Sequence, residues 1–195
     1  MYSNKPGDFD LVVPQPDCDE DLSKATDFLK AGALQNAIFN SVNFSSIATD
    51  EHGVIQLFNM GAERMLGHAA ADVVNRKTPS QISDPDEIIA RAKALSVEFG
   101  KDIKPGFEAL VFKASRGIED IYELTYIRKD GSRLPAIVSV TALRDAHNDI
   151  IGYLLIGTDN TLRKQIEAER SQVASELQLA KAAAEKASLA KSEAT

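Results

Sequence analysis

The stretch IYELTYIRKDGSRLPAIVSVTALRDAHNDIIGYLLIGT, residues 121–158, decides the fold of this chain. Apolar and polar residues alternate over 121–128 and 134–143, and residues 150–158 are mostly apolar. Such runs, separated by short polar segments rich in Asp, Asn and Gly, are typical of consecutive antiparallel strands. Because proline cannot donate to a strand ladder, Pro135 is expected at a strand start or on an edge strand.

Two earlier strands are predicted over residues 46–49 and 54–58. They flank the tetrapeptide Asp50-Glu51-His52-Gly53, whose final glycine suits a tight turn. Between this hairpin and residue 121 the apolar spacing is helical, which predicts short helices over 60–66, 69–74, 79–82, 85–99 and 106–116. The order of elements predicts an α+β fold, in which a five-stranded antiparallel sheet carries the helices on one face.

Charge and composition divide the rest of the chain into segments that precede and follow the compact domain. The start is acidic and contains three prolines, which predicts a disordered acidic leader over residues 1–20. Apolar residues at spacings of three and four then predict an amphipathic helix over 21–43. The compact domain is expected over 44–161, and residues 162–195, which lack Gly and Pro, are expected to form one long helix.

The last segment has the pattern of a coiled coil. Steps of four and three connect its seam positions, which predicts a parallel homodimer. A single helix packed back on its own domain is the alternative. The apolar seam residues are Ile166, Val173, Leu177, Ala180 and Ala184.

Composition excludes several function classes. The chain has 22 basic and 29 acidic residues, and the resulting net charge of −7 repels nucleic-acid phosphates. No apolar run approaches the ~20 residues of a membrane span, and the start lacks a secretory signal, so we interpret the protein as cytoplasmic. The lone Cys18 and the three histidines form no cluster with metal-ligand spacing, so no metal site is expected. Catalytic motifs are absent from the sequence, which predicts that the chain is not an enzyme.

Several short motifs follow one another in order: IATD at 47–50, GVI at 53–55, FN at 58–59, AERMLG at 62–67, YIRKDGS at 126–132 and GY at 152–153. Together they resemble a PAS domain, the small sensory module of bacterial signalling proteins. Asp159-Asn160-Thr161 resembles the tripeptide that closes such domains. The resemblance implies that these three residues form a junction through which a signal passes into the following helix. It also implies that Glu63 pairs with Arg128 or Lys129.

The segment AKAAAEKASLAKSE at 180–193 is similar to the linker that precedes the dimerisation and phosphoacceptor domain of many sensor histidine kinases. This resemblance implies a sensory input and dimerisation module of a bacterial two-component histidine kinase, with the kinase domains outside this chain. Two alternatives stay open. One is a ligand-free module for constitutive dimerisation or partner docking, and the other is an input domain of a different output, such as a diguanylate cyclase.

The PAS resemblance places any ligand between the inner sheet face and the helices. A covalent flavin adduct requires a cysteine where this chain has Asn75-Arg76-Lys77-Thr78, and haem requires a histidine that is missing from 85–100. Neither group is expected, and the cofactor stays unknown. The candidates for a small-molecule pocket, which on the alternative view only fill the core, are Asn59, Ile88, Ala92, Leu95, Thr125, Val138, Val140, Tyr153 and Leu155. Residues 101–119 are expected either to cover this pocket or to be a surface elaboration.

Overall fold

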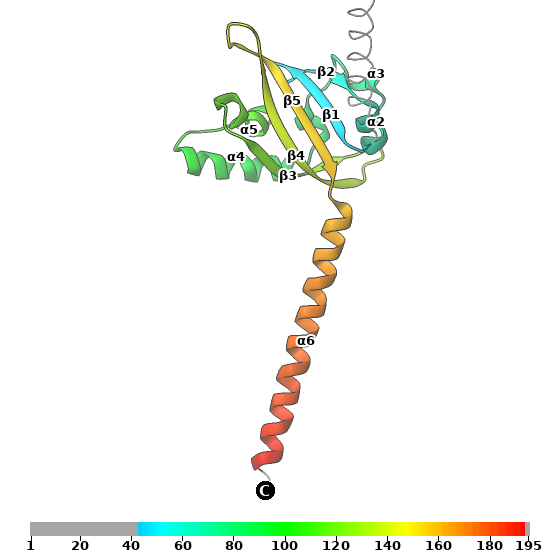
Figure 1. The fold of residues 1–195 in the computed structure, drawn as a ribbon, viewed down its shortest axis with the longest axis vertical. Coiled ribbons are helices and arrows are strands. Elements are labelled where there is room, and N and C mark those ends of the chain that lie inside the picture. Colours follow the sequence, from blue (N-terminus) through cyan, green and yellow to red (C-terminus); the bar gives the residue numbers. More distant parts are fainter. Residues whose placement is uncertain (1–42, 194–195) are drawn as a thin grey trace, which may run out of the picture. The chain divides into compact units, whose positions relative to one another are not determined.

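The structure is a computed structural model that describes residues 43–193. The leader predicted over 1–20 lies outside the described residues, as does nearly all of the helix predicted over 21–43. Five strands form one antiparallel sheet in the order β2-β1-β5-β4-β3 (Figure 1). They are β1 (Ser45–Asp50), β2 (Ile55–Phe58), β3 (Asp120–Ile127), β4 (Arg133–Arg144) and β5 (Ile150–Asp159). The predicted α+β class, the sheet and both of its predicted turns at 129–132 and 145–149 are confirmed.

The helices lie between β2 and β3 in the chain. They are α2 (Met60–Leu66), α3 (Ala70–Val73), η1 (Pro79–Ile82), α4 (Pro85–Phe99), α5 (Phe107–Val111) and η2 (Ala114–Arg116). Local capping explains where the best-defined ones begin. The Asn59 side chain accepts a hydrogen bond from the backbone N–H of Ala62, and Asp84 accepts from the first turn of α4. Gly67 and Gly100 end α2 and α4 in the left-handed conformation.

Pro135 is not on an edge strand. It is the third residue of β4, close to the strand start that was the other expected position, and β4 is flanked by β3 and β5. The ladder tolerates the missing N–H because β5 leaves the sheet beside it: Ala136 pairs with Asp159, the last residue of β5. The Pro135 carbonyl oxygen accepts a hydrogen bond from the Asn160 N–H at 2.9 Å. Pro135 therefore lies beside Asn160, the residue between the end of β5 and the start of α6.

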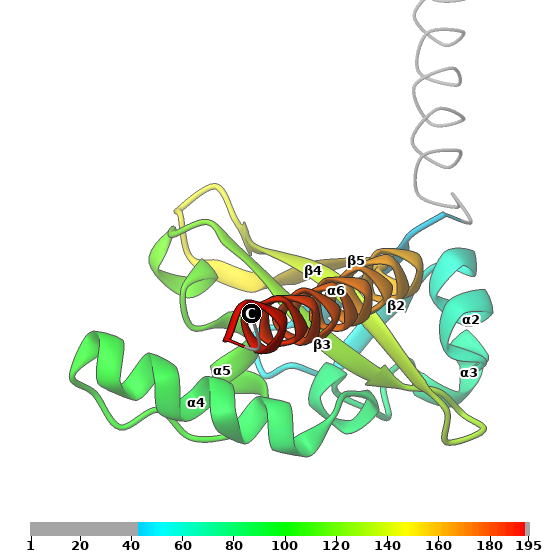
Figure 2. The same cartoon turned by 90° about the horizontal axis from the view of Figure 1, so that it is seen from below.

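The middle of the segment 101–119 belongs to the core. α5 contacts both α4 and β4, and Figure 2 shows it between α4 and the strands. Four residues in succession, Ala109, Leu110, Val111 and Phe112, are at most 5% exposed. Its buried side chains lie in the same cluster as those of α4 and the sheet, so the segment is more than a surface elaboration.

The long C-terminal helix α6 (Thr161–Glu193) begins one residue after β5 ends (Figure 1). Every residue from Leu162 to Lys186 is exposed. α6 contacts the sheet only around its first turn, where it meets β4 and Glu123 of β3. Over the described residues, the helix is therefore not packed back on its own domain. No described helix combines the length and apolarity that crossing a membrane would require.

Candidate functional site

Six of the predicted pocket residues meet in one apolar cluster between the sheet and the helices. Ile88, Ala92 and Leu95 come from α4, and Val138, Val140 and Leu155 come from the two central strands. All six are at most 4% exposed. They pack with the buried residues of α5 in the same cluster. The structure thus brings these candidates together, in an interior that α5 shares.

The two polar candidates lie elsewhere. Asn59 accepts hydrogen bonds from the N–H groups of Ser46 and Ala62, at 2.9 and 2.7 Å, so its amide joins β1 to the start of α2. Thr125 of β3 pairs with Pro135 of β4, so the two side chains lie on the same face of the sheet. Pro135 and Val138 are three residues apart on β4, and Thr125 therefore lies on the face opposite to Val138. Its hydroxyl donates to Glu87 of α4 at 2.7 Å. Both groups therefore have structural partners outside the apolar cluster.

Tyr126 is the polar residue of the inner face that the sequence interpretation missed. It is fully buried, and burial raises the pKa of its hydroxyl to about 12, although the neighbouring Ser45 hydroxyl opposes this shift. Ser45 donates to the Gly157 carbonyl at 3.2 Å. The Tyr126 oxygen itself has no hydrogen-bond partner of good geometry among the described residues. Strand alternation would have placed Tyr126 beside Leu124 on the buried face.

A cluster around Arg91 fastens α5 to α4 and β3. The Arg91 guanidinium contacts both Asp120 carboxylate oxygens at 2.7 Å, donates to the Ala109 carbonyl at 2.9 Å and lies 3.4 Å from the centre of the Tyr122 ring. The Tyr122 hydroxyl donates to the Leu110 carbonyl at 3.0 Å. Burial raises the pKa of Tyr122, so this hydroxyl stays protonated. Two backbone carbonyls of α5 thus accept hydrogen bonds from the partly buried side chains of Arg91 and Tyr122, which fixes the position of α5.

The predicted junction residues lie at the boundary between β5 and α6. The Asp159 carboxylate accepts a hydrogen bond from the Thr161 N–H at 2.8 Å, so it caps the first turn of α6. Asn160 is 4% exposed, and its carbonyl accepts from the Lys164 N–H at 3.0 Å. Its side-chain amide nitrogen is buried without a partner among the described residues. The junction is therefore an ordered turn in which Asn160 points inward.

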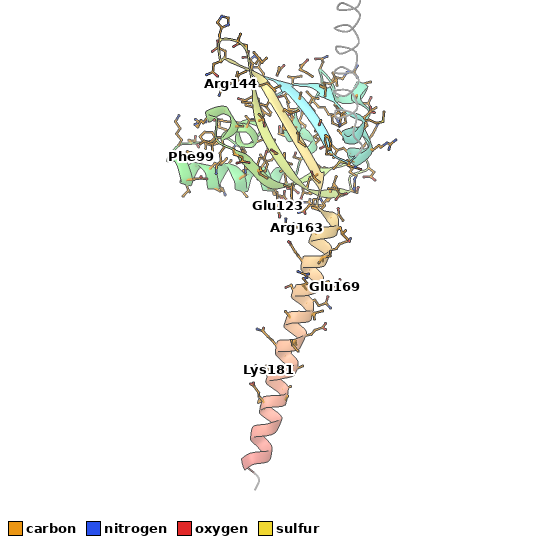
Figure 3. The ribbon with its side chains drawn as sticks, viewed as in Figure 1. Phe99, Glu123, Arg144, Arg163, Glu169 and Lys181 are labelled. Carbon is orange, nitrogen blue, oxygen red and sulfur yellow. The ribbon has the colours of Figure 1, made fainter. Side chains whose placement is uncertain are left out.

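An ion pair links the first turn of α6 to the sheet. The Lys164 ammonium contacts the Glu123 carboxylate of β3, and this hydrogen bond raises the pKa of Lys164. Figure 3 shows Glu123 at the end of the sheet where α6 begins, near Arg163. Both partners are about half exposed, with side-chain exposures of 44% and 52%. An exposed pair of this kind contributes little to stability, so it orients the helix more than it stabilises the fold.

The predicted pairing of Glu63 is wrong. Its carboxylate accepts a hydrogen bond from the Ala70 N–H at 2.6 Å and so joins α2 to α3. Lys129 pairs instead with Asp72, at 3.0 Å, and the Arg128 guanidinium donates to the Met65 carbonyl at 2.8 Å. Backbone groups at helix ends lack partners within the helix and compete for charged side chains. Here the Ala70 N–H binds Glu63, and the Met65 carbonyl binds Arg128.

Metal and cofactor chemistry has few candidates in the described part of the chain. Residues 43–193 contain no group of three or more His, Cys, Asp or Glu side chains that could hold a metal ion. His52 and His147 lie in exposed turns, where each faces a neighbouring carboxylate. His68 is 8% exposed, and burial lowers its pKa, with Lys77 and Lys129 adding to the shift. Cys18 lies outside the described residues.

Comparison with known proteins identifies the fold. A model of the family described as PAS domain matches residues 43–161. No curated protein matches the chain. Among solved structures, an RNA-binding Light-Oxygen-Voltage receptor is 17% identical with a TM-score of 0.55, over 90% of this chain and 42% of that one.

Two solved PAS domains are similar over most of their own length. One, from an HTR-like protein of Haloarcula marismortui, is 16% identical with a TM-score of 0.49 and covers 71% of this chain and 98% of its own. The other, from Colwellia psychrerythraea, is 20% identical with a TM-score of 0.49 and covers 68% and 96%. The family match spans the whole sheet, all the short helices and the junction, and the chain therefore belongs to the PAS domain family.

Proposed function

We propose that this chain is the sensory input and dimerisation module of a bacterial two-component histidine kinase. A small-molecule or conformational signal changes the PAS core, and α6 passes the change to a kinase domain outside this chain. The observation that carries the proposal is the direct connection of the central strand β5, through the single residue Asn160, to a helix that is exposed from Leu162 to Lys186. A change in the sheet would reach α6 without crossing a loop.

The surface of α6 supports the dimerisation part of this proposal. Ile166, Val173 and Leu177 are 41%, 58% and 68% exposed, and they lie on one stripe with the 4-3 spacing of a coiled-coil seam. Isolated helices are marginally stable in water, and an apolar stripe gains stability when it is buried. A second copy of α6 carries a stripe of the same spacing and can bury it in parallel register.

A second candidate function is a ligand-free module for dimerisation or partner docking. The buried position of α5 favours it, because α5 side chains already share the interior with Ile88, Ala92 and Leu95. Native mass spectrometry and an absorbance spectrum of the purified chain distinguish the two functions. A co-purifying small molecule supports the ligand sensor, and a mass equal to that of the bare chain supports the docking module.

Sedimentation analysis tests dimerisation. We expect the chain to sediment as a dimer at micromolar concentration and the variant Val173→Lys/Leu177→Lys to sediment as a monomer, because two buried lysine pairs would repel. The matched control Ser175→Lys/Ala182→Lys adds the same charge on the opposite side of α6 and should remain dimeric. A monomeric unmodified chain, or equal behaviour of the two variants, would overturn the proposal.

A further inference from the structure

A groove of about 360 Å³ lies between the β1–β2 turn and the segment of α5 and η2. Its volume is at the lower end of the ~300–1,000 Å³ of small-molecule sites. The side chains that matter for its chemistry are Glu51, Phe107, Glu108, Phe112, Arg116 and Tyr153. Of the residues that the sequence suggested for a pocket, only Tyr153 lines this groove.

Aromatic side chains form one wall of the groove. The rings of Phe107 and Tyr153 meet edge to face, with centroids 5.5 Å apart and planes at 76°. Phe107 also lies against the turn: a β-carbon built at Gly53 would be 2.5 Å from its ring. The turn glycine therefore allows the ring to approach the backbone, and the aromatic wall has a fixed position.

The Tyr153 hydroxyl is available to a ligand. Tyr153 is 7% exposed as a whole residue, and its hydroxyl, which makes no hydrogen bond within the part of the chain that the structure describes, is open to solvent. Burial raises its pKa, so the group stays neutral and can both donate and accept. A hydroxyl without a protein partner that lines a groove is a position where a bound molecule can replace water as the hydrogen-bond partner.

The charges around the groove favour a cation. Glu51 and Glu108 contribute two carboxylates, and His52 lies 3.4 Å from the Glu51 carboxylate. Arg116 contributes one guanidinium, and the charge of Arg144 also acts on Tyr153. The Arg116 guanidinium already has partners, because it lies 3.5 Å from the centre of the Phe112 ring and donates to the Phe112 carbonyl at 3.0 Å. Glu108 makes no ion pair within the described residues. Glu108 thus places an unpaired negative charge beside the aromatic wall.

We propose that this groove binds a small planar aromatic molecule that carries a protonated amine. The ring packs against Phe107 and Tyr153, the Tyr153 hydroxyl hydrogen-bonds to the ligand, and the amine lies near Glu108 and Glu51. This inference rests on the proposed sensory function in one respect only. α5 forms one side of the groove and also contacts β4, so binding in the groove would reach the sheet through α5.

Three indole probes test the ligand class by calorimetric titration and by amide chemical shifts. Tryptamine carries the amine, tryptophol replaces it with a hydroxyl, and indole-3-acetate replaces it with a carboxylate. We expect tryptamine to bind about tenfold more tightly than tryptophol, with shifts centred on Gly53 and Glu108, because a hydrogen bond to a charged group exceeds one to a neutral group by about that factor. Indole-3-acetate should bind most weakly. Equal binding of all three probes, or no shifts at millimolar concentration, would refute the site.

Matched variants test the residues. Tyr153→Phe should weaken tryptamine binding by about three- to tenfold, the range expected for one lost hydrogen bond. Tyr126→Phe is its control, because Tyr126 also has an unpartnered hydroxyl but does not line the groove. Glu108→Gln should weaken tryptamine and leave tryptophol unchanged, whereas Glu119→Gln, outside the groove, should change neither. An effect of the control variants as large as that of the groove variants would contradict the assignment.

The same titration on the Val173→Lys/Leu177→Lys chain separates this inference from the proposed function. Tryptamine binding by that variant with unchanged affinity shows that the groove is a site independent of the α6 seam. If the unmodified chain is monomeric and still binds tryptamine, the relay proposal fails and the site stands. If it is dimeric and binds none of the probes, the site fails and the relay proposal stands.

Discussion

Tyr126 of β3 lies against Gly157 of β5, across the intervening strand β4. A β-carbon built at Gly157 would be 3.0 Å from Cε2 of the Tyr126 ring and 2.6 Å from the Ser45 hydroxyl oxygen. The ring therefore occupies the space that a side chain at residue 157 would need. This contact joins the edge strand to the strand that continues into α6, and it fills the inner sheet face near the junction.

Glycine substitutions on β5 test this packing. Gly157→Ala should destabilise the fold by ~1–3 kcal/mol, because the Tyr126 ring or Ser45 must move in a packed interior. Gly152→Ala should cost more, since a β-carbon there would be 2.0 Å from the backbone carbonyl oxygen of Thr49, which cannot rotate away. Urea unfolding measures both. Gly117→Ala is the control, because a β-carbon built there has no atom within 4 Å. Its only expected loss of stability is the ~1 kcal/mol that alanine costs in a left-handed backbone conformation. Equal losses at all three positions would show that the packing is not specific.

Two buried tyrosines should respond differently to loss of their hydroxyls. Tyr122→Phe should destabilise the fold by about 1–3 kcal/mol, because the Leu110 carbonyl of α5 loses its partner. Tyr126→Phe should be neutral or slightly stabilising, because the hydroxyl that it removes is buried without a partner. Thermal and urea unfolding of the two variants provide the comparison. A larger loss for Tyr126→Phe than for Tyr122→Phe would contradict this description of the interior.

The predictable part of the fold is the part that local patterns control. Strand alternation, the turn residues and the helical spacing of apolar residues predicted the order of elements and most of their bounds to within one residue. The burial of residues 109–112 was not predictable, because an apolar helix of this length has the same pattern as a surface cover and as a core element. Only its long-range contacts with α4 and β4 decide between them.

The wrong predictions about the site concern which strand residues face the interior and which partner a charged side chain takes. Choosing Thr125 in place of Tyr126 is a shift of one residue on β3, and in a strand this moves the side chain to the opposite face. Glu63 was expected to pair with a cation, but the backbone N–H of Ala70 lies within reach and takes its carboxylate. Both outcomes depend on register and on loop geometry, which spacing along the chain does not determine.

His68 should make stability depend on pH. Its pKa in the folded protein is below the ordinary 6.5, so the unfolded chain binds the proton more readily. Stability is therefore complete above pH ~6.5 and falls as the pH falls below it. Between pH 7.5 and 5.5 the unmodified chain should lose more stability than His68→Phe in urea unfolding. The same loss in both proteins would show that other groups cause the pH dependence.

Asp159 should control how α6 leaves the sheet. Asp159→Ala removes the hydrogen bond to the Thr161 N–H and should cost ~0.5–2 kcal/mol of helix capping. Hydrogen exchange should become faster in the first turn of α6, whereas the sheet stays protected. Asp130→Ala, which removes the similar bond to the Ser132 N–H in the β3–β4 turn, is the control and should leave α6 unchanged.

In a histidine kinase that carries this input domain, Asp159→Ala should also change basal activity or abolish the response to signal. The Asp130→Ala control should leave both unchanged. Unmodified activity and response in the Asp159 variant would mean that the junction is a passive connection, and the docking-module function would gain support.

The most direct test of the central claim, that two copies of α6 form a parallel seam through which the PAS core acts, is disulfide formation along the helix. In a Cys18→Ser background, Ala180→Cys places a thiol on the seam and Ala182→Cys places one on the opposite side, and both positions are exposed in the single chain. After mild oxidation we predict a covalent dimer for the Ala180 variant and almost none for the Ala182 variant. Equal crosslinking at the two positions, or none at Ala180, would contradict the seam and with it the proposed relay.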